Sequence, residues 1–256
     1  MLSEVFLAAL IWSDAIKSFC SPPKNVAIVG LARDIESDEF LYCEFHYLDW
    51  GGDSAKVQYV DVQGDVFATK NVDYAHGLER PAIDQFDSRW NEKRIVDIAE
   101  KKFTLQFQKS DKSGLKRKAY AIDQVDIIDA GFDHFVRANW DDLQRSPATV
   151  RFASVPHLKI LKLRVSSQPM KNCPKVVDSD NFYCYWVDIG NPFVRLFTGR
   201  LRLVYSQDRM LNLFEGVVNI NRAVGQSQKA RIRYEYDLSQ LEKGGSTSES
   251  AANFPD

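Results

Sequence analysis

The chain has 256 residues, of which 45% are hydrophobic and 27% charged, a balance typical of globular proteins. Its length falls between one and two average domains and allows about three quarters of the unfolded surface to be buried. The formal net charge of -2 argues against a protein built around the phosphate backbone of nucleic acid, so we expect no nucleic-acid partner.

The N-terminal segment, residues 1–23, contains an apolar run from Val5 to Trp12. The run is too short for a membrane-spanning helix, which needs about 20 residues, and no other stretch of the sequence qualifies. Its length matches the apolar core of a secretory signal peptide, but Glu4 stands where a basic residue normally precedes that core. Two interpretations stay open: an export signal, which predicts a periplasmic or exported protein, and a packed helix ending at residues 21–23, which allows a cytoplasmic one.

The first half of the remaining chain has the pattern of strands joined by short turns. Extended stretches at 40–48, 56–62 and 66–72 are separated by turn signals, which predicts a three-stranded antiparallel meander. Residues 77–92 interrupt the pattern with Pro81 and a cluster of charges, and we interpret them as a loop network. Phe103, Leu105 and Phe107 then alternate with polar residues, which predicts a strand with one buried face, paired with a strand at 119–122.

One amphipathic helix is predicted for residues 130–145. Apolar residues recur there at spacings of three and four, which places them on one stripe: Phe132, Phe135, Val136, Trp140 and Leu143. The Ser146-Pro147 pair ends the helix. The apolar stripe requires an apolar partner, and the concave face of a sheet is the expected one.

Strand patterns resume after the helix and continue to residue 236. Phe, Tyr and Trp recur beside Val and Ile, a composition that favours sheets. About ten strands in all predict a mainly β domain over residues 24–240: a curved antiparallel sheet, as an open or half barrel, around the amphipathic helix. Residues 241–256, rich in small and polar side chains, are predicted to form a flexible tail.

Several stretches together resemble a group of uncharacterised, usually exported bacterial proteins. They are residues 41–46 (LYCEFH), the turn from Gln63-Gly64 to 68–70 (ATK), 131–136 (GFDHFV) and 214–220 (FEGVVNI), within a match from about Ala32 to Asp237. The architecture is also similar to half-barrel lipoprotein carriers and to the cofactor-free half-barrel enzyme of violacein synthesis. This resemblance implies a half-barrel fold, whereas function has to be argued from a site.

The four cysteines allow three complete pairings, between which the sequence does not choose. The simpler interpretation is that most are buried free thiols. The alternative pairs Cys173 with Cys184 across an 11-residue step, which requires an oxidising compartment.

Motifs for catalysis or metal binding are sparse. The four histidines form no metal-binding pattern, so we expect neither a metal nor another cofactor. Glu44 and His46 lie two residues apart in a strand and therefore share a face, which makes them weak catalytic candidates as an acid–base pair; an exposed polar strand face is the alternative. His134 beside Asp133 is interpreted as a surface residue.

Basic residues cluster around the hairpin that follows Phe103: Lys101, Lys102, Lys109, Lys112, Lys116, Arg117 and Lys118. The cluster fits an anionic lipid surface or an acidic partner. Edge-strand lysines that discourage strand pairing are the alternative.

Three functional hypotheses follow. The first is a binding protein that holds an apolar small molecule, a lipid or a lipidated partner in the concave sheet, with a predicted lining of Phe103, Leu105, Phe107, Phe135 and Trp140. The second is a cofactor-free enzyme that uses a polar pocket with Glu44, His46 or Tyr234. The third is an envelope structural or assembly protein, favoured if the sheet interior is fully packed.

Overall fold

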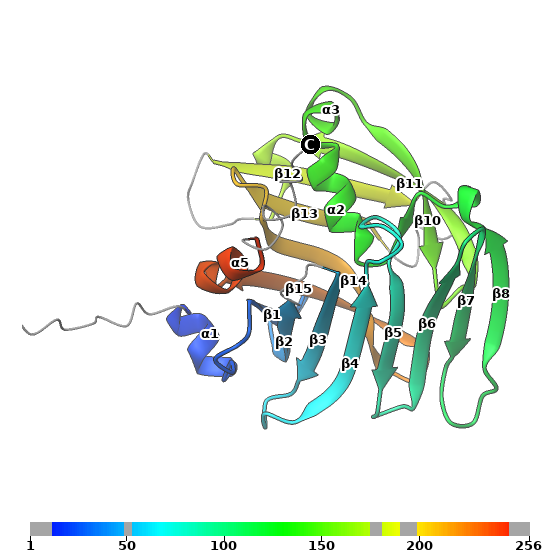
Figure 1. Cartoon of the computed structure of the whole chain (residues 1–256). Coiled ribbons are helices and arrows are strands. Elements are labelled where there is room, and N and C mark those ends of the chain that lie inside the picture. Colours follow the sequence, from blue (N-terminus) through cyan, green and yellow to red (C-terminus); the bar gives the residue numbers. More distant parts are fainter. Residues whose placement is uncertain (1–11, 49–52, 175–180, 190–198, 246–256) are drawn as a thin grey trace, which may run out of the picture.

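The computed structural model describes residues 12–48, 53–174, 181–189 and 199–245 (Figure 1). The first eight strands are β1 (Ile28–Asp34), β2 (Phe40–Leu48), β3 (Ser54–Val60), β4 (Val66–Asp73), β5 (Ala82–Asp87), β6 (Glu92–Ala99), β7 (Lys102–Gln108) and β8 (Lys116–Ala121). The others are β9 (Ile127–Ile128), β10 (Ala148–Ser154), β11 (Lys159–Gln168), β12 (Phe182–Ile189), β13 (Leu201–Ser206), β14 (Leu211–Ala223) and β15 (Gln226–Tyr236). The helices are α1 (Asp14–Phe19), α2 (Gly131–Ala138), α3 (Trp140–Arg145) and α5 (Leu238–Gly245), with short 3-10 turns η1 (Ile122–Gln124) and η2 (Met170–Asn172).

All of these strands belong to one sheet, in the order β8-β7-β6-β5-β4-β3-β2-β1-β15-β14-β13-β12-β11-β10-β9. The first and last strands pair antiparallel in the middle of the sheet, and two meanders run outward from this pair. The pairs are antiparallel except β9 with β10, which is parallel. The predicted meander at 40–72 corresponds to β2, β3 and β4, and the predicted helix interrupts the series between β9 and β10.

The sheet curls so that its two arms face each other, but it does not close into a barrel (Figure 1). The edge strands β8 and β9 share no backbone ladder. Instead, side chains of β4–β7 pack against side chains of β9 and β10 in one core cluster, and the Tyr120 hydroxyl donates to the Leu158 carbonyl at 2.7 Å. The prediction of a mainly β, open or half-barrel architecture is confirmed.

The amphipathic helix lies on the concave side, as predicted, but it is broken in two at Asn139. Its apolar stripe packs against β10–β13 in the largest core cluster. Both the backbone and the side-chain amide of Asn139 donate to the Phe135 carbonyl, at 3.0 and 2.9 Å. An Asn side chain that competes for a main-chain carbonyl in this way favours a helix end, so the single helix over 130–145 was wrong. No helix in the described ranges is long and apolar enough to cross a membrane.

The opposite, outer face of the central strands is covered by α1. Ile16 is fully buried against side chains of β1, β2 and β3, and Cys20 at the helix end is bonded to Cys43 on β2. The N-terminal segment is thus tied to the sheet from Ser13 onward, whereas the apolar run at 5–11 lies outside the described residues. Helix α5 extends to Gly245, into the stretch predicted as a tail, and residues 246–256 are likewise outside the described part.

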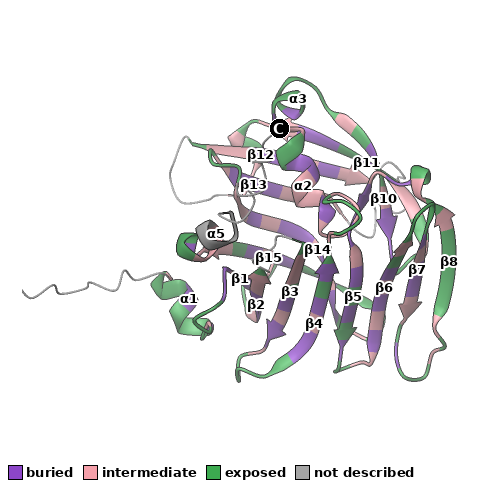
Figure 2. Ribbon diagram, in the orientation of Figure 1, coloured by how far each residue is buried: buried purple, intermediate pink, exposed green. Residues whose placement is uncertain are grey.

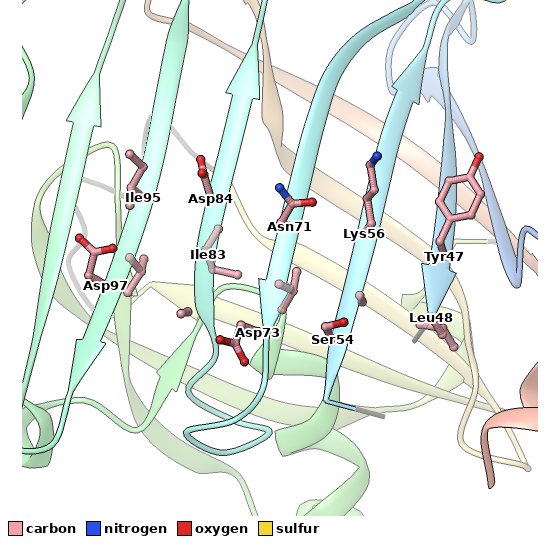
Figure 3. A pocket seen from close by; sticks show the side chains of 14 residues that line it. Tyr47, Leu48, Ser54, Lys56, Asn71, Asp73, Ile83, Asp84, Ile95 and Asp97 are labelled. Atoms are coloured by element: carbon pink, nitrogen blue, oxygen red, sulfur yellow. The ribbon is translucent and has the colours of Figure 1, made fainter. Parts of the chain in front are cut away.

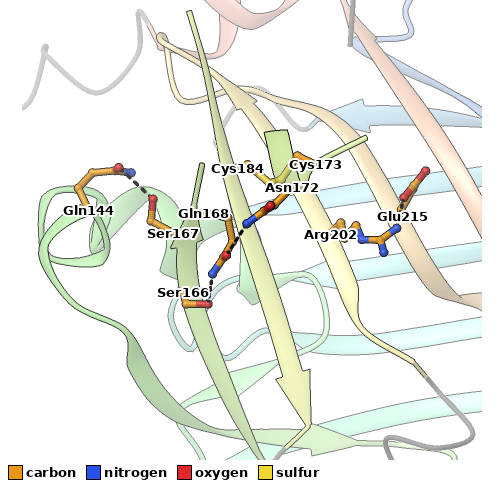
Figure 4. The surroundings of a disulfide bond; sticks show 9 residues. All are labelled: Gln144, Ser166, Ser167, Gln168, Asn172, Cys173, Cys184, Arg202 and Glu215. Atoms are coloured by element: carbon orange, nitrogen blue, oxygen red, sulfur yellow. Dashed lines mark hydrogen bonds and ion pairs between the residues drawn. A yellow bond between two sulfur atoms is a disulfide. The ribbon is translucent and has the colours of Figure 1, made fainter. Parts of the chain in front are cut away.

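Two disulfide bonds join all four cysteines. The Cα atoms of Cys173 and Cys184 are 6.3 Å apart and those of Cys20 and Cys43 are 5.9 Å apart, both within the range of disulfides. The pairing of Cys173 with Cys184 is confirmed, and the expectation of mostly free thiols was wrong. The second bridge fastens η2 to β12 beside a chain of polar contacts from Asn172 through Gln168 to Ser166 (Figure 4).

The fifteen described strands exceed the ten or so predicted: β1 and β6 fall outside the predicted stretches, and β5 lies within the predicted loop at 77–92. In β5 the polar residues Gln85 and Asp87 are buried, at 2% exposure each, while Phe86 is 37% exposed. This alternation is the reverse of a normal amphipathic strand, so the hydrophobic pattern gave no strand signal.

Candidate functional site

The five apolar residues predicted to line a ligand site all face the concave side, but in two separate cores. Phe103 and Leu105 are fully buried and Phe107 is half-buried in the cluster at the open seam of the sheet. Phe135 and Trp140 are 8% and 6% exposed in the helix cluster. A ligand that reached any of the four most buried side chains would therefore have to displace neighbouring core side chains.

The surroundings of Trp140 illustrate how completely the concave face is filled under the helix. Its ring makes edge-on contacts with Tyr183, Tyr185 and Tyr205, at centroid distances of 5.0 to 5.8 Å. The Tyr205 hydroxyl donates to Asp133 at 3.0 Å. Aromatic groups in this arrangement stabilise a core beyond simple burial.

A buried polar network crosses the other half of the interior and joins the two arms of the sheet. Lys70 on β4 lies 2.6 Å from Asp129, which precedes α2, and the Asn219 side chain on β14 donates to the same carboxylate at 3.1 Å. The Lys70 and Asp129 side chains are only 7% and 13% exposed. Both charges are compensated, as buried charges must be.

The network continues along β6. Arg94 donates to Glu92 at 2.7 Å, and Asn221 on β14 donates to the other oxygen of that carboxylate. The Gln85 side chain donates to the Asn219 carbonyl at 3.0 Å. Each cation has its own anion, so the network is neutral and has the character of a structural cross-link between β14 and β4–β6.

The predicted pair of Glu44 and His46 lies on the concave face, and the structure adds Tyr234 to it. Glu44 Oε2 is 3.1 Å from His46 Nε2 and 3.1 Å from the Tyr234 hydroxyl, which donates to it. Burial, and then the charge of Glu44, raise the pKa of Tyr234 well above its usual range, so this phenol stays protonated. The two bonded side chains reach across β1 at Gly30, the residue between them in the sheet.

Gly30 permits this contact because it has no side chain. An added Cβ would lie 2.9 Å from Tyr234 Cε1 and 3.2 Å from Glu44 Cβ. The trio therefore pins β2 to β15 over the central strand. An acid–base pair of this kind can exchange protons, but the surface hollows over β2–β6 and beside α1 are lined by other residues. Within the described ranges no group of three metal-ligating side chains occurs.

A surface hollow lies on the outer face of β2–β6 and has a volume of about 660 Å³ (Figure 3). A row of side chains in register crosses it, each paired with the next on the neighbouring strand: Tyr47, Lys56, Asn71, Asp84 and Ile95. A second row toward the end of the strands contributes Asp73 and Asp97. We call this hollow the outer groove.

The outer groove has a mixed polar and apolar lining and carries a negative excess. Three aspartates face one lysine, which gives a formal charge of −2. At about 4.8 Å per strand, the row from Tyr47 to Ile95 spans about 19 Å. This groove leaves no signal in the sequence because its residues are far apart in the chain. Only the strand register brings them together, and all four pairings between the five strands would have to be predicted correctly to find it.

A smaller hollow of about 230 Å³ lies between α1 and the turn from β3 to β4. Its lining includes Phe19 and Val66, which are 37% and 46% exposed, and the Cys20–Cys43 disulfide.

Two further features of the sequence find their places in the fold. The basic cluster occupies the free edge of the sheet at β8. His134 is half-buried against Tyr74 rather than on the surface, and burial lowers its pKa.

Comparisons with known proteins identify no family for this chain. No family model and no curated protein matches the chain. A solved structure described as a β-barrel-like protein of Domain of Unknown Function DUF1849, from Brucella abortus, matches with a TM-score of 0.40 and 8% identity. The match covers 83% of this chain and 96% of that one. The fold described above rests on the strand pairing of this chain alone.

Proposed function

We propose that this chain is a non-catalytic binding protein that holds an extended polar ligand in the outer groove over β2–β6. The observation that carries the proposal is the register of Tyr47, Lys56, Asn71, Asp84 and Ile95 across five neighbouring strands. Such a row presents its side chains to a ligand that lies perpendicular to the strands, on a rigid backbone that needs no rearrangement.

The chemistry of the groove favours a neutral ligand rich in hydroxyl groups, such as an oligosaccharide. Lys56 donates hydrogen bonds, Asp84 accepts them, and the Asn71 amide does both, which suits hydroxyl groups because they also do both. Tyr47 and Ile95 supply an apolar contact at either end of the row. The excess of aspartates disfavours an anion.

An apolar ligand in the concave sheet is the weaker candidate. The side chains predicted for it are core residues, and Phe103 and Leu105 have no exposed surface. The enzyme hypothesis has the Glu44, His46 and Tyr234 trio in its favour, but these groups hydrogen-bond one another and are accounted for by the contact over Gly30.

Location in an oxidising compartment, such as the periplasm, is part of the proposal. It is supported by the two disulfides, which the cytosol of most organisms would keep reduced. Cell fractionation with an antibody against the chain tests it. Recovery in the cytosolic fraction with all four thiols free would contradict it.

The ligand is tested by nuclear magnetic resonance of isotopically labelled protein titrated with cellotetraose and chitotetraose. We expect amide shifts confined to β2–β6, and a loss of affinity of about tenfold in Asp84→Ala, since one hydrogen bond to a charged group contributes about 1.5–3 kcal/mol. Asp123→Ala, at an equally exposed aspartate on η1, is the matched control and should bind as the parent does. If neither sugar shifts the groove amides, the ligand class is wrong.

A further inference from the structure

The free edge of the sheet carries a concentrated positive charge. Residues 101–118 contain seven basic residues and one acid, Asp111, in a chain whose formal net charge is -2. All seven basic side chains are exposed, and β8, which carries three of them, is the outermost strand (Figure 2). In the described part of the chain none of the seven forms an ion pair. We call Lys109, Lys112, Lys116, Arg117 and Lys118 the basic edge.

The positive charge of the basic edge is hardly offset by acidic residues. Lys101 and Lys102 lie at the other end of β7, where the excess is reduced by Glu100, the preceding residue, and by Asp123, two residues beyond Ala121, the strand partner of Lys102. Around the turn from β7 to β8 only Asp111 opposes the cations, and it accepts the backbone amide of Lys112. The excess is therefore greatest at this turn.

A neighbouring turn adds an apolar tip to the basic edge. The Lys109 side chain lies directly against Gly225, in the turn from β14 to β15. In the same turn Val224 is 41% exposed and Arg222 is exposed as well. An exposed apolar residue beside lysines is the composition of segments that settle at the boundary between lipid headgroups and acyl chains.

Protection of the sheet edge accounts for only part of this pattern. Lysines on an edge strand prevent pairing with another sheet, which explains Lys116, Arg117 and Lys118. Lys109 and Lys112, however, precede β8 and lie in the turn, where no strand can pair. Their charges therefore need another explanation, and the exposed apolar side chain of Val224 beside them favours contact with a lipid surface.

We propose that the basic edge, with Val224 at its tip, docks the protein on a surface of anionic phospholipid headgroups. Side chains alternate along β8, so Lys116 and Lys118 lie on one face and Arg117 on the other, and a surface that meets the free edge of the sheet can contact all three. Each basic residue near such a surface raises partitioning about fivefold. The basic edge shares no residue with the row of Tyr47 to Ile95, which Arg117 continues two strands beyond Ile95, and this inference does not depend on the proposed ligand.

The test is co-sedimentation of the full chain with vesicles of phosphatidylcholine alone and of phosphatidylcholine with 30 mol% phosphatidylglycerol. We expect binding to the anionic vesicles only, weakened by 0.5 M salt because screening is then strong. The variant K116Q/R117Q/K118Q should lose about a hundredfold in partitioning. The variant K159Q/K162Q/R164Q removes the same charge from exposed positions on β11 and should bind as the parent does.

Circular dichroism and thermal melting establish that both variants fold. Equal binding to both vesicle types, or equal losses in both variants, would overturn the proposal. Binding of poly-glutamate without binding of either vesicle would assign the edge to an acidic protein instead. A second variant, Val224→Asp, should weaken vesicle binding and leave the melting temperature unchanged, since Val224 lies at an exposed turn.

Discussion

Breaking the buried pair of Lys70 and Asp129 should destabilise the fold more than any surface change. In Lys70→Met the side chain keeps its length but loses its charge, and the buried Asp129 carboxylate retains the hydrogen bond from Asn219. At the observed separation of 2.6 Å, the attraction is about 6 kcal/mol for an effective dielectric constant of about 20. Desolvation offsets part of this, so we expect a loss of about 3–5 kcal/mol in unfolding free energy.

The prediction is sharpened by a double-mutant cycle. Asp129→Asn removes the partner charge and is compatible with the positive φ of 39° at this residue, which Asn tolerates. The double variant K70M/D129N leaves no unpaired charge, so its loss should be smaller than the sum of the single losses by about 2 kcal/mol. Equilibrium unfolding in urea, with the slope checked for constancy, measures all three.

The control is Arg145→Met, which breaks the ion pair with Asp142 on α3. The two side chains are 73% and 74% exposed, so solvent screens this pair and the unfolding midpoint should not move. A loss below about 1 kcal/mol in Lys70→Met, or strictly additive losses in the cycle, would refute the view that the interior network links the two arms of the sheet.

Three further changes test other parts of the structure. Gly30→Ala should cost about 1–3 kcal/mol of unfolding free energy, because the new Cβ would press on the Tyr234 ring at 2.9 Å; an unchanged melting curve would show that the sheet adapts freely. Burial, and then a neighbouring arginine, lower the pKa of His134 in the folded state. The unfolding free energy should therefore be at its full value above about pH 6.5 and fall below it, as the unfolded chain takes up the proton. The variant His134→Gln should flatten this slope between about pH 7.5 and 5, and parallel slopes in the two proteins would contradict the assignment. The variant C173S/C184S should lose about 2–4 kcal/mol, and its melting temperature should respond to reductant less than that of the parent; an equal response would mean that this bridge contributes nothing.

The sequence predicts the strands that have a clear apolar pattern, but it misses β5 and β6, whose inward-facing side chains include polar ones. The stretch from Phe182 to Ile189 is apolar on both faces, and β12 covers the same residues. β5 was not predicted because Gln85 and Asp87 point inward, and an alternation of apolar residues cannot detect a strand whose buried side chains are polar. The partners of such residues lie far away: the Gln85 side chain bonds the main chain at Asn219, 134 residues later.

The candidate sites likewise combine features that local spacing predicts with features that depend on long-range strand pairing. Glu44 and His46 could be placed on one face from the spacing of two residues, and they hydrogen-bond as that spacing allows. Their contact with Tyr234 depends on β15 lying beside β1, which is a pairing across the whole chain. The outer groove depends on the register of five strands, so neither site was within reach of local reasoning.

The pairing of the first strand with the last has a kinetic consequence. Each arm of the sheet is a series of neighbours in the chain, and β1 with β15 is the one strand pair, among the described strands, that joins the two ends. Until β15 is synthesised, β1 has an unpaired edge in the middle of the future sheet, and closing this contact is the entropically slow step. A circular permutant that joins β15 to β1 and opens the chain between β8 and β9 would turn the whole sheet into one continuous meander, and we expect it to fold faster than the natural order of strands.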